Sequence, residues 1–302
     1  MKILLTGAYE YTDYQLELFK KKGHTIYYIN RESEIAQNDD IPVQDIDAVI
    51  CNRIFEYIDI RRFVNLKKIH AISSGINQFP IDYINENGIK LSNSRGVYSI
   101  PIAEFAVTGI LNIIKHSSHF YDNKINKRWD KDRSLEELTD KKVLIIGAGD
   151  IGNEVAKRMR VFCDIVDGIN RTVYSNDNFN MIYPLTQLKA IVNGYDIIVL
   201  CLALTSETKN IINDQIIDRM KQGVIFVNIA RGDLVDENYL IDSVMEKRIG
   251  GAVLDVFKEE PLPDYNKLWD MDNVIITPHN SFVSNRNKER LWNIIAKEFE
   301  IF

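Results

Sequence analysis

Three closely spaced glycines between a strand-like run and a helix-like run constrain this chain more than any other feature. The apolar run KKVLIIG leads into the stretch GAGDIG, and the amphipathic stretch NEVAKRMRVF follows. In this order the first glycine permits a tight turn, the second lets a pyrophosphate approach the backbone, and the third lets the helix pack on the strand. Phosphate oxygens then meet the N–H groups at the helix N-terminus. We therefore predict a dinucleotide site at Gly147, Gly149, Asp150, Ile151 and Gly152.

Length, charge and cysteine content limit the remaining possibilities. A chain of 302 residues is long enough for two ordinary domains. Its formal net charge of −6, without a long block of one sign, argues against nucleic acid or an acidic membrane as a partner and favours small molecules. The three cysteines are widely spaced, which favours free thiols in a reducing cytoplasm over disulfides or a zinc site. Neither a signal peptide nor a membrane-spanning stretch is expected.

Short apolar runs alternate with helix-like segments along both halves of the chain. The runs are KILLTG, HTIYYI, DAVICN, KKIHAISSG and IKLSNS in the first hundred residues, and KVLIIG, CDIVDGI, DIIVLCLA, GVIFVNIA, GGAVLDVF and NVIITPH later. Nearly continuous apolar runs are typical of parallel strands that are buried on both faces. We predict an α/β fold of two doubly wound parallel sheets, with a Rossmann dinucleotide-binding domain (residues 99–280) inserted into a flavodoxin-like substrate domain (residues 1–98 and 281–302). A helix near Pro101 should connect the domains, and the C-terminal helix should pack on the first.

The residues after the second strand of the dinucleotide domain bear on the choice of cofactor. An acidic side chain at this point would bind both ribose hydroxyls of NAD, but the chain has Asn170, Arg171 and Thr172. A guanidinium beside polar side chains can instead bind a 2′-phosphate. We therefore predict NADP as the preferred cofactor and NAD as the alternative. The alternative interpretation of Arg171 is that it is a solvated loop residue without a role in binding. Asp167 lies too early in the strand to be the expected acid.

Three side chains that could reduce a 2-oxo acid each follow a predicted strand. Arg231 ends the stretch GVIFVNIAR, Glu260 lies just beyond GGAVLDVF, and His279 follows NVIITP. Because the carboxyl ends of parallel strands face the ligand crevice, we expect the three to converge. The guanidinium could hold the carboxylate and polarise the carbonyl, while the glutamate keeps the proton-donating imidazole charged. Each residue also has a structural interpretation when taken alone: Arg231 as a member of a surface ion pair, Glu260 as a solvated acid in a turn, and His279 as a hydrogen-bonded histidine in a turn.

With these motifs in place, the chain resembles the D-isomer-specific 2-hydroxyacid dehydrogenases over nearly its whole length. Besides the glycine loop, the resemblance rests on CLALTSETKNIIND, FVNIARGDLVDE, GGAVLDVFKEEPLP and VIITPHNS. It implies that Arg231 binds the substrate, Glu260 assists and His279 transfers the proton. The expected activity is reduction of a small 2-oxo acid to a D-2-hydroxy acid by NAD(P)H.

The resemblance implies further contacts and an assembly. The backbone of Ser74, Gly75 and Ile76 is expected to receive the substrate carboxylate, and a homodimer is expected through the nucleotide-binding domain. Asp255 is expected to contact the nicotinamide carboxamide. The other cofactor contacts that it implies are Leu202, Ala203, Thr208, Ile229, Ala230 and His279.

The sequence also departs from the family and leaves alternatives open. Many members have an acid at the position of Asn170 and a proline at that of Ala203. A non-catalytic, dinucleotide-sensing regulatory protein of the same fold is the alternative from another class, since a fold does not dictate a function. An NAD-dependent enzyme acting on phosphoglycerate would need extra cations, for which only Arg53 and Arg95 are candidates.

A few other residues have both a structural and a functional interpretation. His116 and His119 could share a helix face, but no third metal ligand is indicated, so no metal site is predicted. Trp129 is expected to pack at a dimer contact rather than to stack on a base. The aromatic residues that could line a substrate pocket, with core packing as the default, are Phe79, Tyr98 and Phe282.

Overall fold

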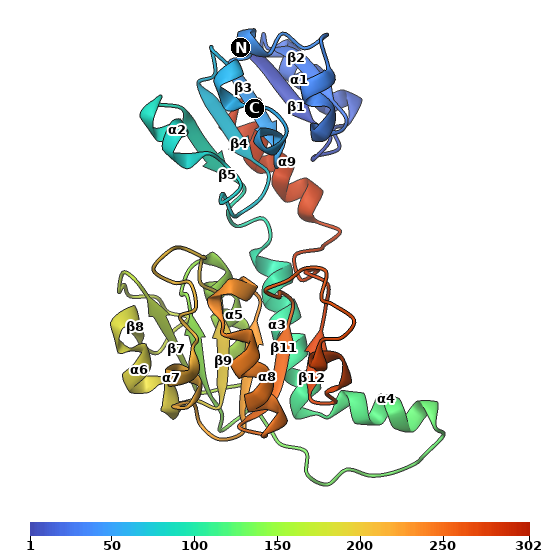
Figure 1. Cartoon of the computed structure of the whole chain (residues 1–302), viewed down its shortest axis with the longest axis vertical. Coiled ribbons are helices and arrows are strands. Elements are labelled where there is room, and N and C mark those ends of the chain that lie inside the picture. Colours follow the sequence, from blue (N-terminus) through green and yellow to red (C-terminus); the bar gives the residue numbers. More distant parts are fainter. The chain divides into compact units, whose positions relative to one another are not determined.

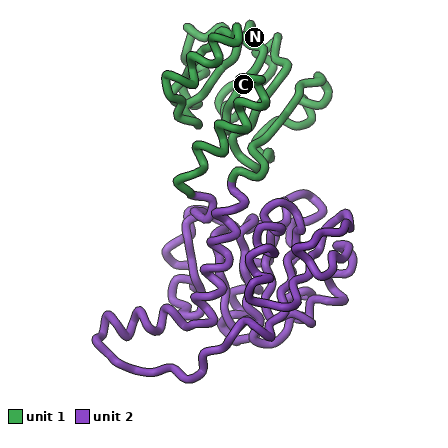
Figure 2. Tube along the Cα trace, turned by 180° about the vertical axis from the view of Figure 1, so that it is seen from behind, with its two compact units in different colours: residues 1–97, 284–302 green, residues 98–283 purple.

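The computed structural model describes residues 1–302, and the chain forms two compact units (Figure 2). The first unit comprises residues 1–97 and 284–302, and the second comprises residues 98–283. The second unit is therefore inserted into the first. The junctions lie at 97/98 and 283/284, whereas the sequence predicts 98/99 and 280/281.

The first unit is built on a five-stranded parallel sheet in the order β2-β1-β3-β4-β5 (Figure 1). This order is the flavodoxin-like one that the sequence predicts. The strands are β1 (Lys2–Thr6), β2 (Thr25–Ile29), β3 (Ala48–Cys51), β4 (Lys68–Ala71) and β5 (Lys90–Asn93). The helices are α1 (Asp13–Lys21), α2 (Ile81–Glu86) and α9 (Asn287–Glu298), with 3-10 turns η1 (Glu32–Gln37), η2 (Val43–Asp45), η3 (Ile54–Glu56) and η4 (Ile60–Arg62).

The C-terminal helix α9 packs within the first unit, as predicted. The fully buried ring of Phe19, from α1, lies edge-on to the rings of Trp292 and Phe299. Lys68 of β4 forms a salt bridge of 2.9 Å with Glu298 and lies over the Phe299 ring. These contacts join the end of the chain to its first hundred residues and so complete the unit.

A buried histidine lies on β4, an inner strand of this sheet. His70 of β4 is fully buried, and its two ring nitrogens lie 2.9 Å from Ser92 Oγ and 3.1 Å from Ser94 Oγ. Burial lowers the pKa of His70 to about 4, because a charged imidazole would lose its hydration there. The residue is therefore a neutral, hydrogen-bonded part of the core.

The second unit is built on a seven-stranded parallel sheet in the order β12-β11-β10-β9-β6-β7-β8. The strands are β6 (Lys142–Ile146), β7 (Ile165–Asn170), β8 (Ile182–Pro184), β9 (Ile197–Leu200), β10 (Val224–Asn228), β11 (Ile249–Leu254) and β12 (Val274–Ile276). The helices are α3 (Ser99–Ile114), α4 (Ser117–Ile125), α5 (Asp150–Met159), α6 (Leu188–Ile191), α7 (Asp214–Ile217) and α8 (Glu237–Met245), with 3-10 turns η5 (Leu185–Gln187), η6 (Val192–Gly194), η7 (Gly232–Leu234) and η8 (Lys267–Asp270). This is the predicted Rossmann arrangement. The sequence did not predict β8, because three residues that include a proline form no recognisable apolar run.

Helices cover both faces of the second sheet, so its central strands are wholly buried. Along β6, Val143 and Ile145 join one hydrophobic core with α3 and α5, whereas Leu144 and Ile146 join the other with α8. Alternate side chains point to opposite faces of a strand, which explains why residues 143–146 are all apolar. The strand order reverses between β6 and β9, and an open α/β sheet has its ligand crevice at the carboxyl ends of the strands at that point.

The segment after α3 forms an arm that extends from the second unit (Figure 1). Helix α3 contains Pro101 in its first turn, where a missing N–H breaks no helical hydrogen bond. Helix α4 and the irregular residues 126–138 then form the arm. It is closed at its base, where Lys115 Nζ donates to the Glu136 carbonyl at 2.6 Å and His116 Nδ1 lies 2.7 Å from Asp132 Oδ2. None of the helices has the length and apolar character needed to cross a membrane.

Candidate active site

The three glycines after β6 differ in what surrounds them. A Cβ atom on Gly147, whose φ is +109°, would lie 2.6 Å from the Cys201 carbonyl carbon, and one on Gly152 would lie 2.1 Å from the Gly147 carbonyl oxygen. A Cβ on Gly149, by contrast, would meet no atom within 4 Å. The outer glycines are therefore required by backbone packing, whereas the middle one borders open space at the start of α5. This arrangement fits the approach of a diphosphate to the helix N-terminus.

The end of β7 carries polar side chains and no exposed acid. Asn170 is partly exposed, and Arg171 and Thr172 are exposed. The Arg171 guanidinium forms no ion pair or hydrogen bond within the chain, so it is available to an anion. Asp167 is buried, and its carboxylate accepts hydrogen bonds from Tyr195 Oη and from a backbone N–H. Asp167 therefore has a structural role, in agreement with the inference that it is not the ribose-binding acid.

The loop after β9 forms part of the same edge of the sheet. Thr208 is buried, and its hydroxyl donates to the Ala203 carbonyl at 2.7 Å and accepts from the Thr205 N–H at 2.8 Å. This hydroxyl therefore holds the loop in shape. Leu202 is partly buried and Ala203 is exposed. Direct contact of these residues with a cofactor stays a prediction.

Arg231 projects from a tight turn at the end of β10. Asn228 fixes this turn, since its side chain donates to the Arg231 carbonyl and accepts from the Ala230 N–H, both at 3.1 Å. Ile229 and Ala230 are buried in the cores on opposite faces of the sheet. A Cβ on Gly232 would lie 2.0 Å from the Phe257 carbonyl carbon, so only glycine lets this turn lie against the loop after β11.

Two opposing effects act on the charge of the Arg231 side chain. The guanidinium donates to the Ala230 carbonyl at 2.6 Å and still reaches solvent. Desolvation by the surrounding loops lowers the pKa of Arg231, and the charge of Glu260 partly offsets this effect. Arginine nonetheless remains charged at neutral pH, so the turn presents a cation near the Glu260 carboxylate.

Glu260 and His279 form a hydrogen-bonded pair. His279 Nδ1 lies 2.9 Å from Glu260 Oε2, and Glu260 Oε1 accepts from the Phe257 N–H at 3.1 Å. Both side chains are partly exposed. The carboxylate fixes the orientation of the ring and engages Nδ1, which leaves Nε2 as the nitrogen that can exchange a proton with a ligand. The structure thus brings together the three side chains that the sequence singled out.

Asp255 holds the loop that carries His279. Asp255 is fully buried, and its Oδ1 accepts from Thr277 Oγ1 and from the Asn280 N–H, both at 2.7 Å. Its Oδ2 accepts from the Ser281 N–H at 3.1 Å, and its carbonyl accepts from the His279 N–H at 2.8 Å. These bonds support a left-handed backbone at His279, where φ is +50°. The sequence did not predict this supporting role; the nicotinamide contact expected of Asp255 stays a prediction.

The three candidate pocket aromatics have different surroundings. Phe79 is buried in the first unit, where it lies edge-on to Phe55. Phe282 is 41% exposed and lies edge-on to His279 at 6.3 Å between ring centroids. Tyr98 packs edge-on against Phe282, and burial raises the pKa of its hydroxyl to about 12. Core packing therefore accounts for Phe79, while Phe282 lies beside the candidate proton donor.

The loop expected to receive a carboxylate follows β4 in the first unit. Ser74, Gly75 and Ile76 are partly exposed, and none of their three consecutive N–H groups donates to another part of the chain. A run of unpaired backbone N–H groups is a suitable anion receptor. The predicted carboxylate contact of these residues, all of which lie in the first unit, stays a prediction.

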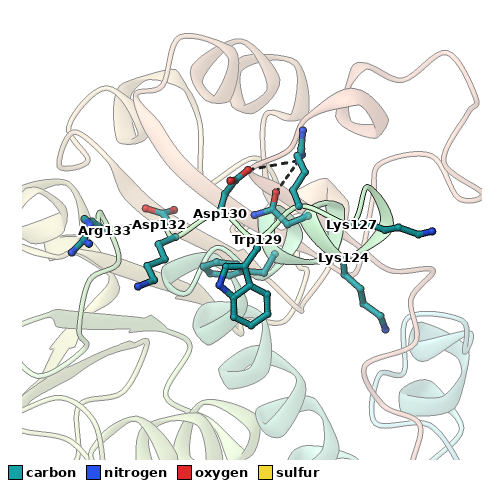
Figure 3. A pocket seen from close by; sticks show the side chains of 10 residues that line it. Lys124, Lys127, Trp129, Asp130, Asp132 and Arg133 are labelled. Atoms are coloured by element: carbon teal, nitrogen blue, oxygen red, sulfur yellow. Dashed lines mark hydrogen bonds and ion pairs between the residues drawn. The ribbon is translucent and has the colours of Figure 1, made fainter.

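The arm carries a hollow that is separate from these groups (Figure 3). The hollow measures about 730 Å³ and is lined by residues of α4 and of the following segment, with Trp129 93% exposed. His116 and His119 are bound within the arm, to Asp132 and to Asn123 respectively.

Comparison with known proteins gives one consistent family. The family model described as "D-isomer specific 2-hydroxyacid dehydrogenase, NAD binding domain" matches residues 107–281. Glyoxylate reductase from Pyrococcus horikoshii is 30% identical over 86% of this chain and 80% of its own length, and hydroxypyruvate reductase from Thermotoga maritima is 35% identical over 71% and 70%. The crystal structure of a glyoxylate reductase from Paecilomyes thermophila superposes with a TM-score of 0.85 at 21% identity, over 99% of this chain and 95% of that one. At this identity the superposition supports the fold alone.

Proposed function

The chain belongs to the D-isomer-specific 2-hydroxyacid dehydrogenase family, and on that premise we propose how its residues reduce a small 2-oxo acid to a D-2-hydroxy acid with a nicotinamide dinucleotide. The observation that carries the proposal is the pair of Glu260 and His279 beside Arg231, at the same sheet edge as the glycine loop. Function is argued from these groups, because the fold alone is compatible with many activities.

Each side chain has a distinct task in this proposal. The bound nicotinamide supplies the hydride that the carbonyl carbon accepts. Arg231 binds the substrate carboxylate and polarises the carbonyl, and His279 donates the proton from Nε2 to the carbonyl oxygen. Glu260 keeps the ring oriented through Nδ1. In the oxidation of the 2-hydroxy acid, His279 accepts the proton that it donates in the reduction.

We assign the remaining substrate and cofactor contacts as follows. The N–H groups of Ser74, Gly75 and Ile76 bind the carboxylate, which their lack of other partners supports. The residues that we assign to the cofactor are Gly147, Gly149, Asp150, Ile151, Gly152, Asn170, Arg171, Thr172, Leu202, Ala203, Thr208, Ile229, Ala230, Asp255 and His279. The open space at Gly149 supports the placing of the diphosphate.

NADPH is the cofactor that we favour over NADH. Arg171 is exposed and has no partner within the chain, and no carboxylate at the end of β7 would repel a 2′-phosphate. The Arg171→Ala change should therefore weaken NADPH binding by at least tenfold more than NADH binding, because only NADPH carries the phosphate. Fluorescence titration of both cofactors measures this, and an equal loss for both would contradict phosphate recognition by Arg171.

A small, singly charged substrate is the one that we favour. Several relatives that match over 70% or more of the chain bear the names glyoxylate reductase and hydroxypyruvate reductase, and another, 31% identical over 80% of the chain, is named D-3-phosphoglycerate dehydrogenase. A phosphoglycerate substrate would need additional cations, and the exposed Arg53 guanidinium of the first unit lies 3.9 Å from the Glu56 carboxylate. Initial rates with glyoxylate, hydroxypyruvate, pyruvate, phenylpyruvate and 3-phosphohydroxypyruvate, each with NADPH and NADH, decide among these substrates.

The same assay separates the enzyme from a dinucleotide sensor. An enzyme oxidises NADPH only when a 2-oxo acid is present, and chiral chromatography of the product then detects the D isomer. Tight NADPH binding without turnover of any of these acids would favour the sensor instead. The complete set of Arg231, Glu260 and His279 supports the enzyme.

We further propose that the enzyme is a cytoplasmic homodimer that uses the arm. Three free cysteines, two of them buried, suit a reducing compartment. The most exposed apolar side chains of the arm are Tyr121 (65%), Ile125 (62%) and Trp129 (93%), and exposed apolar surface of this kind is typical of a contact site. Sedimentation velocity should give the mass of two chains for the wild type and a shift towards one for Trp129→Ala. A wild type that sediments as a single chain would refute the dimer.

A further inference from the structure

In the loop after β4, hydrogen bonds from neighbouring groups hold three successive carbonyl groups, while the N–H groups of residues 74–76 stay unpaired. The Ser73 carbonyl accepts from the Ser94 N–H at 3.1 Å, and the Ser74 carbonyl accepts from Asn93 Nδ2 at 2.7 Å. The Gly75 carbonyl accepts from Ser73 Oγ at 2.7 Å. Since a peptide group is planar, fixing a carbonyl also fixes the direction of the N–H that follows it. These anchors therefore determine where the N–H groups of residues 74–76 point.

Gln78 controls one of these anchors without reaching the N–H groups itself. Its Nε2 donates to Ser73 Oγ at 2.8 Å and to the Asn52 carbonyl at 3.1 Å. Because Ser73 Oγ accepts from Gln78, its own hydrogen is directed to the Gly75 carbonyl. Gln78 thus sets the direction of the hydroxyl that holds Gly75.

The far end of this chain of hydrogen bonds is fixed to two strands. The Asn52 and Arg53 N–H groups, just after β3, donate to the Glu32 carboxylate at 2.6 Å each. The same carboxylate accepts from Thr6 Oγ1, at the end of β1, at 2.7 Å. Gln78 therefore ties the loop to a part of the backbone that is itself held.

We propose that Gln78 is a positioning residue for substrate binding, which acts through Ser73 to hold the N–H groups of residues 74–76 in place for the carboxylate of the 2-oxo acid. This inference rests on the proposed function, because that function supplies the carboxylate. Gln78 takes no part in the transfer of hydride or proton, so its loss weakens substrate binding and leaves the rate at saturation nearly unchanged.

The test replaces Gln78 by methionine, which has a similar length and no donor. Gln78→Met should raise KM for the best 2-oxo acid about tenfold, the effect of losing one hydrogen bond worth about 1.4 kcal/mol. The value of kcat should stay within about twofold, and the Kd of NADPH should not change, because the proposed cofactor residues are in the second unit. The matched control is Gln222→Met, since Gln222 Nε2 also donates to one backbone carbonyl, that of Lys247 at 2.7 Å, in the other unit.

A double-mutant cycle tests whether Gln78 acts through the hydroxyl. Ser73→Ala should also raise KM, and the combined variant should raise it no more than the larger single change, because both remove the same anchor. If the increase in KM of the combined variant equals the product of the two single increases, Gln78 does not act through Ser73. A fall in kcat at unchanged KM would also overturn the inference. If Gln78→Met does not fold, Ser73→Ala decides alone: an unchanged KM overturns the inference and an increase supports it.

Binding of oxamate distinguishes failure of this inference from failure of the proposed function. Oxamate carries the carboxylate and carbonyl of a 2-oxo acid but is not reduced, and its Kd is measured by calorimetry with NADPH present. If the wild type turns over no 2-oxo acid, yet binds oxamate about ten times more tightly than Gln78→Met, the proposed activity fails and the positioning role stands. Equal oxamate affinity, or no binding to the wild type, overturns the positioning role.

Discussion

Gly149→Ala should weaken cofactor binding without lowering the stability of the fold. A Cβ at this position meets no atom within 4 Å, and the backbone is extended with φ at −90°, which alanine adopts readily. The free energy of unfolding should therefore stay unchanged or rise by up to about 1 kcal/mol, since alanine restricts the unfolded chain more than glycine does. Gly152→Ala should be strongly destabilising, because its Cβ would lie 2.1 Å from the Gly147 carbonyl oxygen.

The methyl group of Gly149→Ala should act on cofactor binding instead. It would occupy the open space at the start of α5 that we assign to the diphosphate. A hydrogen bond to a charged group contributes roughly 1.5–3 kcal/mol, so the loss of one such bond should weaken NADPH binding between about tenfold and a hundredfold. The effect on kcat at saturating NADPH should be small, because three strands separate β6, which precedes the glycine loop, from β12, which precedes the proposed proton donor.

Urea unfolding and NADPH fluorescence titration measure the two quantities on the same protein. Gly194→Ala is the matched control, because a Cβ there also meets open space, at the end of the 3-10 turn η6, which we do not assign to the cofactor. Wild-type NADPH affinity in Gly149→Ala would refute the assigned diphosphate position. A large drop in its unfolding free energy would refute the argument that the site has room for the methyl group.

The other predictions concern the proton donor, its support and the buried histidine. His279→Ala should lower kcat by at least about a thousandfold while the Kd of NADPH stays within about twofold; a matching loss in cofactor binding, seen by fluorescence titration, would make His279 structural. In the wild type the Ser281 N–H donates to Asp255 Oδ2 at 3.1 Å, and Asp255→Asn would place an NH₂ group against this donor, so kcat/KM should fall by at least about tenfold. Steady-state rates test this, and a loss confined to NADPH affinity would favour a cofactor contact. For His70, burial lowers the pKa from 6.5 to about 4, so the unfolded chain takes up a proton that the folded chain does not, and stability is lost as pH falls from about 6.5 towards 4. Between pH 7.5 and 5, urea unfolding of the wild type should lose about 2 kcal/mol more than that of His70→Gln; equal losses would contradict this assignment.

Strand positions and the ends of strands could be predicted because their signals are local. A strand buried on both faces needs an unbroken apolar run, and β6, β9 and β10 each have one. Strand β8 was missed because only three residues, with Pro184 among them, form it. Arg231, Glu260 and His279 could be singled out because each follows a recognisable run, and parallel strands end at one edge.

Hydrogen bonds between distant segments could not be predicted in this way. Asp255 reaches Asn280 across 25 positions, and Gln78 reaches Asn52 across 26. Nothing in an aspartate or a glutamine indicates which backbone group it will meet, because that depends on how the loops after different strands pack. The sequence by itself determined the two sheets, the glycine loop and the side chains that we propose as reactive. Only the tertiary structure decided which polar groups hold those side chains and loops in place, because such partners are set by packing in space and not by order along the chain.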